Sequence, residues 1–445
     1  MNGTREFRAG CGQCQGQGEG RGWGLGMSTQ GSQVMTRWEN CMRIASTSIF
    51  LFCFLLTGCL SPIALHRAVL EYDRTVSQVE AELLLLNIAR ARHHRPVHFT
   101  AVSSVAATFD FRTNVGIRGG FGPSTDPSER PLTLEYGASV AENPTVTIVP
   151  ILGEEFTKRI LRPLEESHFD FLAHQGFDIN MILRLMAKGM VLEDGEKGRT
   201  VLFNAPARRE EYAVFRQRLL HLASLQQART LYIEPLSYEE AFPVALDRAL
   251  TPAEVVAALD KGYRWGVKNQ VNSQILTRKV VGRLVITNYE PWRLTNEERH
   301  LLNEEIQRFP LDYVFVDIRS GHPGGEWPMR GVIQLRSFNA IIGFVARGIS
   351  EEPGFHVEPD TRTGPVFMNP DHVLDVDETP STPKDVQFSV EFEGTYYSIS
   401  KFPISRGMVP SWNQESFAVL ANLFQMTVTD VSNVKTPIIS IPKGG

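Results

Sequence analysis

A two-residue alternation of apolar and polar positions runs through residues 105–117 and returns in residues 132–140. This period predicts β-strands with one apolar and one polar face. A loop rich in glycine, proline and serine separates the two stretches, so the pattern predicts a long β-hairpin. The apolar positions that we expect to form its assembly or membrane face are Val105, Phe109, Phe111, Val115, Ile117, Leu132, Leu134 and Tyr136.

A hairpin of this length cannot bury its own apolar face, so another surface has to cover it. Three covers fit the pattern: the body of the same chain, a neighbouring subunit, or membrane lipid, the last if hairpins from several chains close into a barrel. Transmembrane strands need about 9 to 11 residues with alternating faces, and both arms meet this requirement. The likeness to oligomeric outer-membrane channels is one of architecture, not of a sequence motif, and the sequence leaves the three covers open.

Ahead of the hairpin, a heptad pattern at residues 64–93 predicts one long α-helix. Pro96 ends this helix after a run of cations, which suits the negative C-terminal end of a helix dipole. The run contains His93 and His94, and His98 follows. We expect these histidines to complement the helix end rather than to bind a metal.

The rest of the chain mixes helical and strand patterns without a regular βαβ rhythm, which predicts an α+β fold. Thr251 and Thr295 each carry a capping-box signal and predict helix starts. Further helices are expected at 154–161, 178–188 (ending at Gly189), 207–227 and 337–346. Strands are expected at 143–152, 230–236, 275–289, 312–319, 331–337, 386–392 and 395–400.

These patterns predict six segments along the chain. They are a leader and signal peptide at 1–58, an anchor, tether and long helix at 59–96, a protruding hairpin region at 97–152, an α+β body at 153–350, a Pro- and acid-rich linker at 351–385, and a small α+β unit at 386–445.

An export signal is predicted before residue 60. Two arginines precede an apolar segment at 44–56 that is too short for a membrane-spanning helix. The segment ends in Leu-Thr-Gly-Cys at 56–59, which resembles the lipobox of bacterial lipoproteins. The resemblance implies cleavage between Gly58 and Cys59, a diacylglyceryl group on the thiol of Cys59, and, because Leu60 follows rather than an aspartate, passage to the outer membrane. The several acyl chains of a lipoprotein make such an anchor effectively permanent.

Cysteine positions and charge exclude some classes of function. All five cysteines lie at or before Cys59, so neither a disulfide nor a cysteine nucleophile is expected after it. The net charge of −5 becomes −7 from Cys59 onward, with 40 basic and 47 acidic residues, and argues against nucleic acid or anionic lipid as the main partner. We expect outer-membrane lipid, further copies of the chain or another envelope protein instead. Residues 1–34 precede the signal, and we expect Met35 or Met42 to be the initiator.

Signatures of catalysis are missing from the sequence after Cys59, which contains no P-loop, nucleophile elbow, zinc-protease helix or dinucleotide-binding glycine pattern. His322 and Glu326 lie together in a Pro/Gly-rich loop and are an acid–base or metal candidate, although a solvated turn explains them more simply. Trp292, Trp327 and Trp412 are candidates for sugar stacking, and packing explains each of them equally well. We expect no metal and no cofactor besides the covalent lipid.

The favoured hypothesis is a non-enzymatic lipoprotein, anchored in the outer membrane with a periplasmic body, that acts in an assembly, as a scaffold or as a component of an oligomeric export channel. The alternative is a lipid-anchored periplasmic enzyme or glycan-binding protein that uses a pocket near His322 and Trp327.

Overall fold

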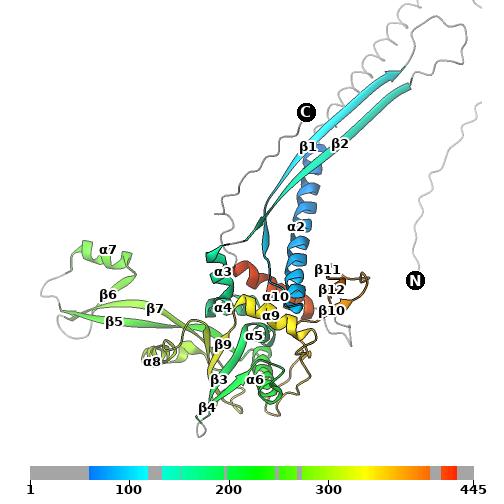
Figure 1. The fold of residues 1–445 in the computed structure, drawn as a ribbon. Coiled ribbons are helices and arrows are strands. Elements are labelled where there is room, and N and C mark those ends of the chain that lie inside the picture. The colour runs from blue at the N-terminus through cyan, green and yellow to red at the C-terminus, as the bar shows by residue number, and fades with distance from the viewer. Residues whose placement is uncertain are drawn as a thin grey trace, which may run out of the picture. The chain divides into compact units, whose positions relative to one another are not determined.

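A computed structural model describes residues 60–118, 133–151, 153–194, 198–245, 250–267, 273–400 and 412–427 of the chain. Its helices and mixed sheets confirm the α+β class (Figure 1). Residues 1–71 and residues 72–445 form two compact units. The lipobox with Gly58 and Cys59 lies outside the described residues, and so does Leu132.

The first described elements are a helix and a two-stranded sheet. Helix α2 spans Leu60–Arg92, and the apolar side chains near its end, such as Leu85 and Ile88, are fully buried in the core. Strands β1 (Thr100–Arg118) and β2 (Thr133–Pro150) pair antiparallel as one long hairpin (Figure 1). No helix in the described ranges is both long enough and apolar enough to cross a membrane.

A mixed sheet forms the centre of the larger unit. In spatial order its strands are β4 (Gly198–Phe203), β3 (Ala187–Asp194), β9 (Met329–Leu335), β8 (Tyr313–Ile318), β7 (Ser273–Thr287) and β5 (Tyr232–Ala245), and β6 (Tyr263–Val267) also pairs with β7. Among the described strands of this sheet only β7 and β8 run parallel, because the connection between them passes through η1 (Pro291–Arg293) and α8 (Asn296–Ile306).

Helices cover both faces of this sheet. On one face Leu302 and Ile306 of α8 pack with Val285 and Phe315. The neighbours of these residues in β7 and β8 alternate to the other face and join the main core. That core also contains residues of α3 (Glu154–Leu161), α4 (Glu166–His174), α5 (Ile179–Met186), α6 (Arg209–Gln227), α9 (Phe338–Gly348) and α10 (Trp412–Thr427). Helix α7 (Pro252–Asp260) lies against β6.

Two predicted boundaries are wrong. The strand expected at 143–152 is not a separate element, because residues 143–150 continue strand β2 and pair with β1. We expected a helix at 178–188 that ends at Gly189, but α5 ends at Met186 and Gly189 lies inside strand β3. A Cβ atom at Gly189 would lie 2.5 Å from the carbonyl oxygen of Leu202 on β4. The glycine therefore permits close approach of two strands and does not stop a helix.

The predicted linker at 351–385 begins with a packed segment that we call the strap, residues 353–375. Val357, Val373 and Leu374 of the strap are buried, so this part of the segment is held against the body and is not a solvated loop. The strap leads into a small antiparallel sheet with the order β10 (Val376–Thr379), β12 (Thr395–Ile399), β11 (Ser389–Phe392). The domain boundaries themselves stay a prediction.

Candidate functional site

The β1–β2 hairpin is the leading candidate, and its register decides what its faces carry. Residues that lie directly opposite each other in a two-stranded ladder share one face. The register pairs Phe111 with Val140, Thr113 with Ala138, Val115 with Tyr136 and Ile117 with Leu134. The apolar positions of the two arms therefore fall on the same face of the hairpin.

The opposite face carries polar or small residues. Its cross-strand pairs are Arg112 with Ser139, Asn114 with Gly137, Gly116 with Glu135, and Arg118 with Thr133. A shift of the register by one residue would bring the apolar positions of one arm onto the polar face of the other. The observed pairing thus combines two separate alternations into one amphipathic sheet.

The apolar face extends from Val105, which pairs with Val146, to Ile117. Twelve residue steps span roughly 40 Å along a strand, which corresponds to roughly 30 Å for a strand tilted by about 40°. That height equals the hydrocarbon thickness of a typical bilayer, about 30 Å. One charged position, Glu142 opposite Phe109, interrupts the face in its lower half.

Both outer edges of the hairpin are open. Within the described ranges, β1 pairs with β2 alone, and the two strands form a sheet of their own. Each arm therefore has a long row of backbone N–H and C=O groups without a partner strand, which is the feature that drives strands of different chains to pair.

Phe99 fixes the base of the hairpin in the core. Its ring is buried and lies 5.9 Å from Phe156 of α3, 6.0 Å from Phe338 of α9 and 5.2 Å from Phe424 of α10, measured between ring centroids. The backbone N–H of Ile151 donates to the carbonyl of Phe99 over 2.9 Å and closes the base. Both arms thus leave a packed aromatic cluster.

Asn87 connects helix α2 to the same base. Its amide oxygen, buried in the helix, accepts a hydrogen bond from the backbone N–H of His98 over 2.7 Å, and Arg90 donates to the carbonyl of His98 over 3.2 Å. The turn between α2 and β1 is therefore held by side chains of the helix that precedes it.

The histidines at the end of α2 contact acidic side chains. His93 lies 3.3 Å from Glu393 and 2.7 Å from the hydroxyl of Tyr397, and His94 lies 3.3 Å from Glu351. Burial, reinforced by nearby carboxylates, raises the pKa of Tyr397 to about 12. The described residues contain no group of three or more His, Cys, Asp or Glu side chains that could hold a metal ion.

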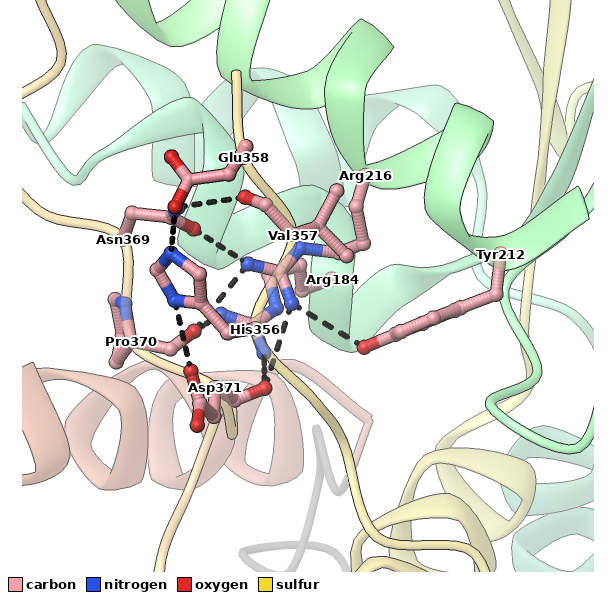
Figure 2. A network of polar contacts seen from close by, with 9 residues as sticks. All are labelled: Arg184, Tyr212, Arg216, His356, Val357, Glu358, Asn369, Pro370 and Asp371. Atoms are coloured by element: carbon pink, nitrogen blue, oxygen red, sulfur yellow. Dashed lines mark hydrogen bonds and ion pairs between the residues drawn. The ribbon is translucent and has the colours of Figure 1, made fainter. Parts of the chain in front are cut away.

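Two buried arginines hold the strap (Figure 2). Arg184 of α5 donates to the carbonyls of Pro370 and Asp371 over 2.8 and 2.6 Å. Arg216 of α6 donates to the amide oxygen of Asn369 over 2.7 Å and to both of those carbonyls at longer range. Because Asn369 in turn donates to the carbonyl of Val357, the arginines fix both limbs of the strap.

The electrostatics of this cluster follow from its burial. Desolvation, and then the neighbouring charge of Arg216, lower the pKa of Arg184. Burial alone would raise the pKa of Tyr212, but the charges of the two arginines and their hydrogen bonds lower it below its ordinary value. The terminal guanidinium nitrogens of both arginines donate to carbonyl, amide or phenol oxygens of the protein, whereas Nε of Arg216 is buried without a partner among the described residues. These hydrogen bonds give the cluster a structural role.

The loop around His322 does not form an acid–base pair. His322 is exposed and lies against Tyr289, with ring centroids 5.4 Å apart, and among the described residues it forms no hydrogen bond or ion pair with Glu326. Asn288 holds the loop by hydrogen bonds to the carbonyls of Arg319 and Pro323. The candidate pair is therefore two solvated side chains on a fixed turn.

Of the three candidate tryptophans, two are core residues. Trp327 is buried between the guanidinium groups of Arg218 and Arg362, and Trp412 is fully buried with its indole N–H donating to the carbonyl of Val373 over 2.9 Å. Only Trp292, of these three, is exposed, with 55% of its surface accessible.

Neither family models, nor curated proteins, nor solved structures give a match to this chain. The candidate site therefore rests on geometry alone. The residues that sequence reasoning missed are those at the base of the hairpin, Phe99 and Asn87, and the two strap arginines. The asparagine next to a helix end and the lone phenylalanine before a strand gave no pattern that could have identified them.

Proposed function

We propose that this protein is a non-enzymatic, lipid-anchored component of the bacterial outer membrane. In this proposal the β1–β2 hairpins of several copies pair edge to edge into one closed sheet, which forms the wall of an export channel or of an envelope scaffold. The observation that carries the proposal is the register, which gathers the apolar positions of both arms on one face and the polar positions on the other.

Edge pairing follows from the two open strands. If β1 of one copy pairs with β2 of the next, every copy presents the same two edges, and repeated rotation closes the ring. Closure removes all open edges at once. The apolar face then contacts lipid, and the polar face, with Arg112, Asn114 and Arg118, lines the interior.

The lipobox supports the location. A diacylglyceryl group on Cys59 would hold helix α2 and the hairpin at the membrane surface before assembly, and the body would remain in the periplasm. Confinement to a surface raises the effective concentration of neighbouring hairpins, as a linker does for tethered binding sites.

The first test is single-particle imaging of the full-length protein extracted in mild detergent, beside Cys59→Ala. We expect a ring with a detergent belt at the hairpins for the wild type and fewer rings for Cys59→Ala. Monomers in the wild-type sample would contradict the proposal.

A matched pair of substitutions tests which face meets lipid. Val115→Arg places a charge on the apolar face, and Asn114→Arg places the same charge on the other face of the same strand. A cationic residue facing lipid costs about 2–4 kcal/mol at the bilayer midplane and about 0–1 kcal/mol near the interfaces. Val115 lies one cross-strand pair from the end of the apolar face, so the cost in each subunit falls between these limits and adds up over the ring. We expect Val115→Arg to abolish the rings and Asn114→Arg to preserve them. Equal behaviour of the two variants would show that the apolar face is not against lipid.

A further inference from the structure

A pocket of about 510 Å³ lies between strand β5, Lys279 of β7 and the segment that leads into helix α8. Its volume is in the range of about 300–1,000 Å³ that small-molecule sites occupy. The pocket belongs to neither the hairpin nor the strap.

Trp292 forms one wall of this pocket. The exposed ring is fixed from several sides: Pro291 before it is buried, Arg293 after it forms an ion pair with Glu290, and the ring of Tyr232 meets it edge-on with centroids 5.5 Å apart. The capping box of Thr295 then locks the chain that follows. An exposed indole on so short and fixed a segment offers a flat platform that loses little entropy on binding.

Charged side chains of both signs surround the platform. Glu234, Glu239, Lys279 and Arg299 line the pocket, and in the described part of the chain none of the four forms an ion pair. The register places Glu239 directly opposite Lys279. The Nε atom of Arg299 is buried and has no hydrogen-bond partner.

The shape and charge of the pocket indicate the chemical class of its ligand. Two carboxylates and two cations balance, so the pocket favours an uncharged ligand that both donates and accepts hydrogen bonds. A sugar ring has this character, because hydroxyl groups surround a ring whose C–H face is apolar and stacks on an aromatic side chain. We propose that the pocket at Trp292 binds a neutral carbohydrate, with the sugar ring on the indole and its hydroxyl groups on Glu234, Glu239 and Arg299.

An extended peptide is the competing occupant, since peptides add to the edges of sheets. Strand β5 is not free to accept one here. Asn296 occupies the edge at Glu239: its amide oxygen accepts from the backbone N–H over 2.7 Å, and its amide nitrogen donates to the carbonyl over 2.8 Å. A peptide that added to this edge at the pocket would find the backbone groups of Glu239 already bonded. The charged side chains that a sugar would contact form no ion pair within the described ranges.

The test is titration calorimetry on the full-length protein in a detergent without a sugar headgroup. The probes are the trimer of N-acetylglucosamine, cellotriose and maltotriose, and an extended tetrapeptide serves as the competing ligand. We expect saturable binding of at least one sugar and none of the peptide. Absence of binding for all three sugars at about 10 mM, a concentration that detects millimolar affinity, would overturn the proposal.

Variants connect the binding to this pocket. Trp292→Ala should weaken the sugar about tenfold, and Trp292→Phe, which keeps an aromatic face, should weaken it less. Phe367→Ala removes an aromatic side chain of similar exposure elsewhere and should leave the affinity unchanged. If Trp292→Ala binds as tightly as the wild type while its thermal unfolding is also unchanged, the sugar binds elsewhere and the proposal fails. The outcome is independent of the ring test.

Discussion

Phe99→Ala measures how firmly the hairpin is fixed in the body. The side chain is 5% exposed and lies against three other phenylalanine rings. Burial of about 200 Å² of aromatic surface at about 25 cal/mol per Å² stabilises the fold by about 5 kcal/mol. Alanine keeps the Cβ carbon, but a cavity remains beside Phe338 and Phe424. We therefore expect the free energy of unfolding to fall by about 4 kcal/mol, in the usual range for such truncations.

Urea denaturation followed by tryptophan fluorescence measures this loss, with Phe171→Ala as the matched control. Phe171 lies in α4 and is 61% exposed, so its truncation should change the free energy of unfolding by less than about 0.5 kcal/mol. Hydrogen exchange adds a local measurement, because the amide of Ile151 bonds to the carbonyl of Phe99 and should exchange faster in Phe99→Ala. A loss below about 1 kcal/mol, or a value equal to the control, would refute the idea that this cluster fixes the hairpin.

Three further substitutions test the strap and the sheet. The hydrogen-bonded ion pair of His372 with Asp375 raises the pKa of the imidazole, so the folded chain binds that proton more tightly than the unfolded chain. The difference in free energy of unfolding between wild type and His372→Gln should therefore be largest near pH 6 and should shrink as the pH rises to about 9. Urea denaturation at the two pH values measures it. Arg216→Met removes the donor to the amide oxygen of Asn369, while Arg184 still bonds the carbonyls of Pro370 and Asp371. The loss should cost about 1–3 kcal/mol and expose the strap to new protease cleavage; a strap that stays resistant would contradict this. Gly331→Ala places a Cβ atom 2.1 Å from the carbonyl oxygen of Val191 and should lower the free energy of unfolding by about 3 kcal/mol in the same denaturation assay. The control Gly348→Ala meets no atom within 4 Å and should leave that free energy unchanged. Equal free energies of unfolding for the two variants would refute the contact.

Local signals in the sequence predicted the helices well. Thr251 and Thr295 cap α7 and α8 as expected, and in each case the glutamate three residues later returns the hydrogen bond. The helices predicted at 154–161 and 207–227 are also confirmed, within two residues at each end. Capping and periodicity act between neighbours in sequence, so the sequence alone contains the information.

Elements that depend on distant partners were missed. Strand β3 has a glycine where a helix end was expected, and its pairing with β9 joins residues more than 130 positions apart. Helix α4 and strands β4 and β6 gave no pattern that stood out from their surroundings. In these segments the tertiary partner decides the structure, and local propensity carries little weight.

The candidate sites, too, could be predicted only where local sequence determines them. The alternation along each arm of the hairpin was predicted, but which residues of the two arms share a face depends on the register. The exposure of Trp292 and the burial of Trp327 and Trp412 could not be distinguished, since each tryptophan stands alone in the sequence. Likewise, nothing near Arg184 or Arg216 indicates that their hydrogen-bond acceptors lie in a strap, more than 150 residues later in the chain.

The hydrogen bonds of Asn296 to strand β5 bear on how copies of the chain avoid aggregation through the central sheet. If copies of this chain pair through open strands as proposed, any other exposed strand edge is a competing site of pairing that leads to aggregates instead of rings. At Glu239 the amide of Asn296 occupies both backbone groups and takes the place of one residue of a partner strand. In the assembly proposed above, this side chain would block pairing at one position of the edge of β5. It would thereby favour joining of copies through their hairpins.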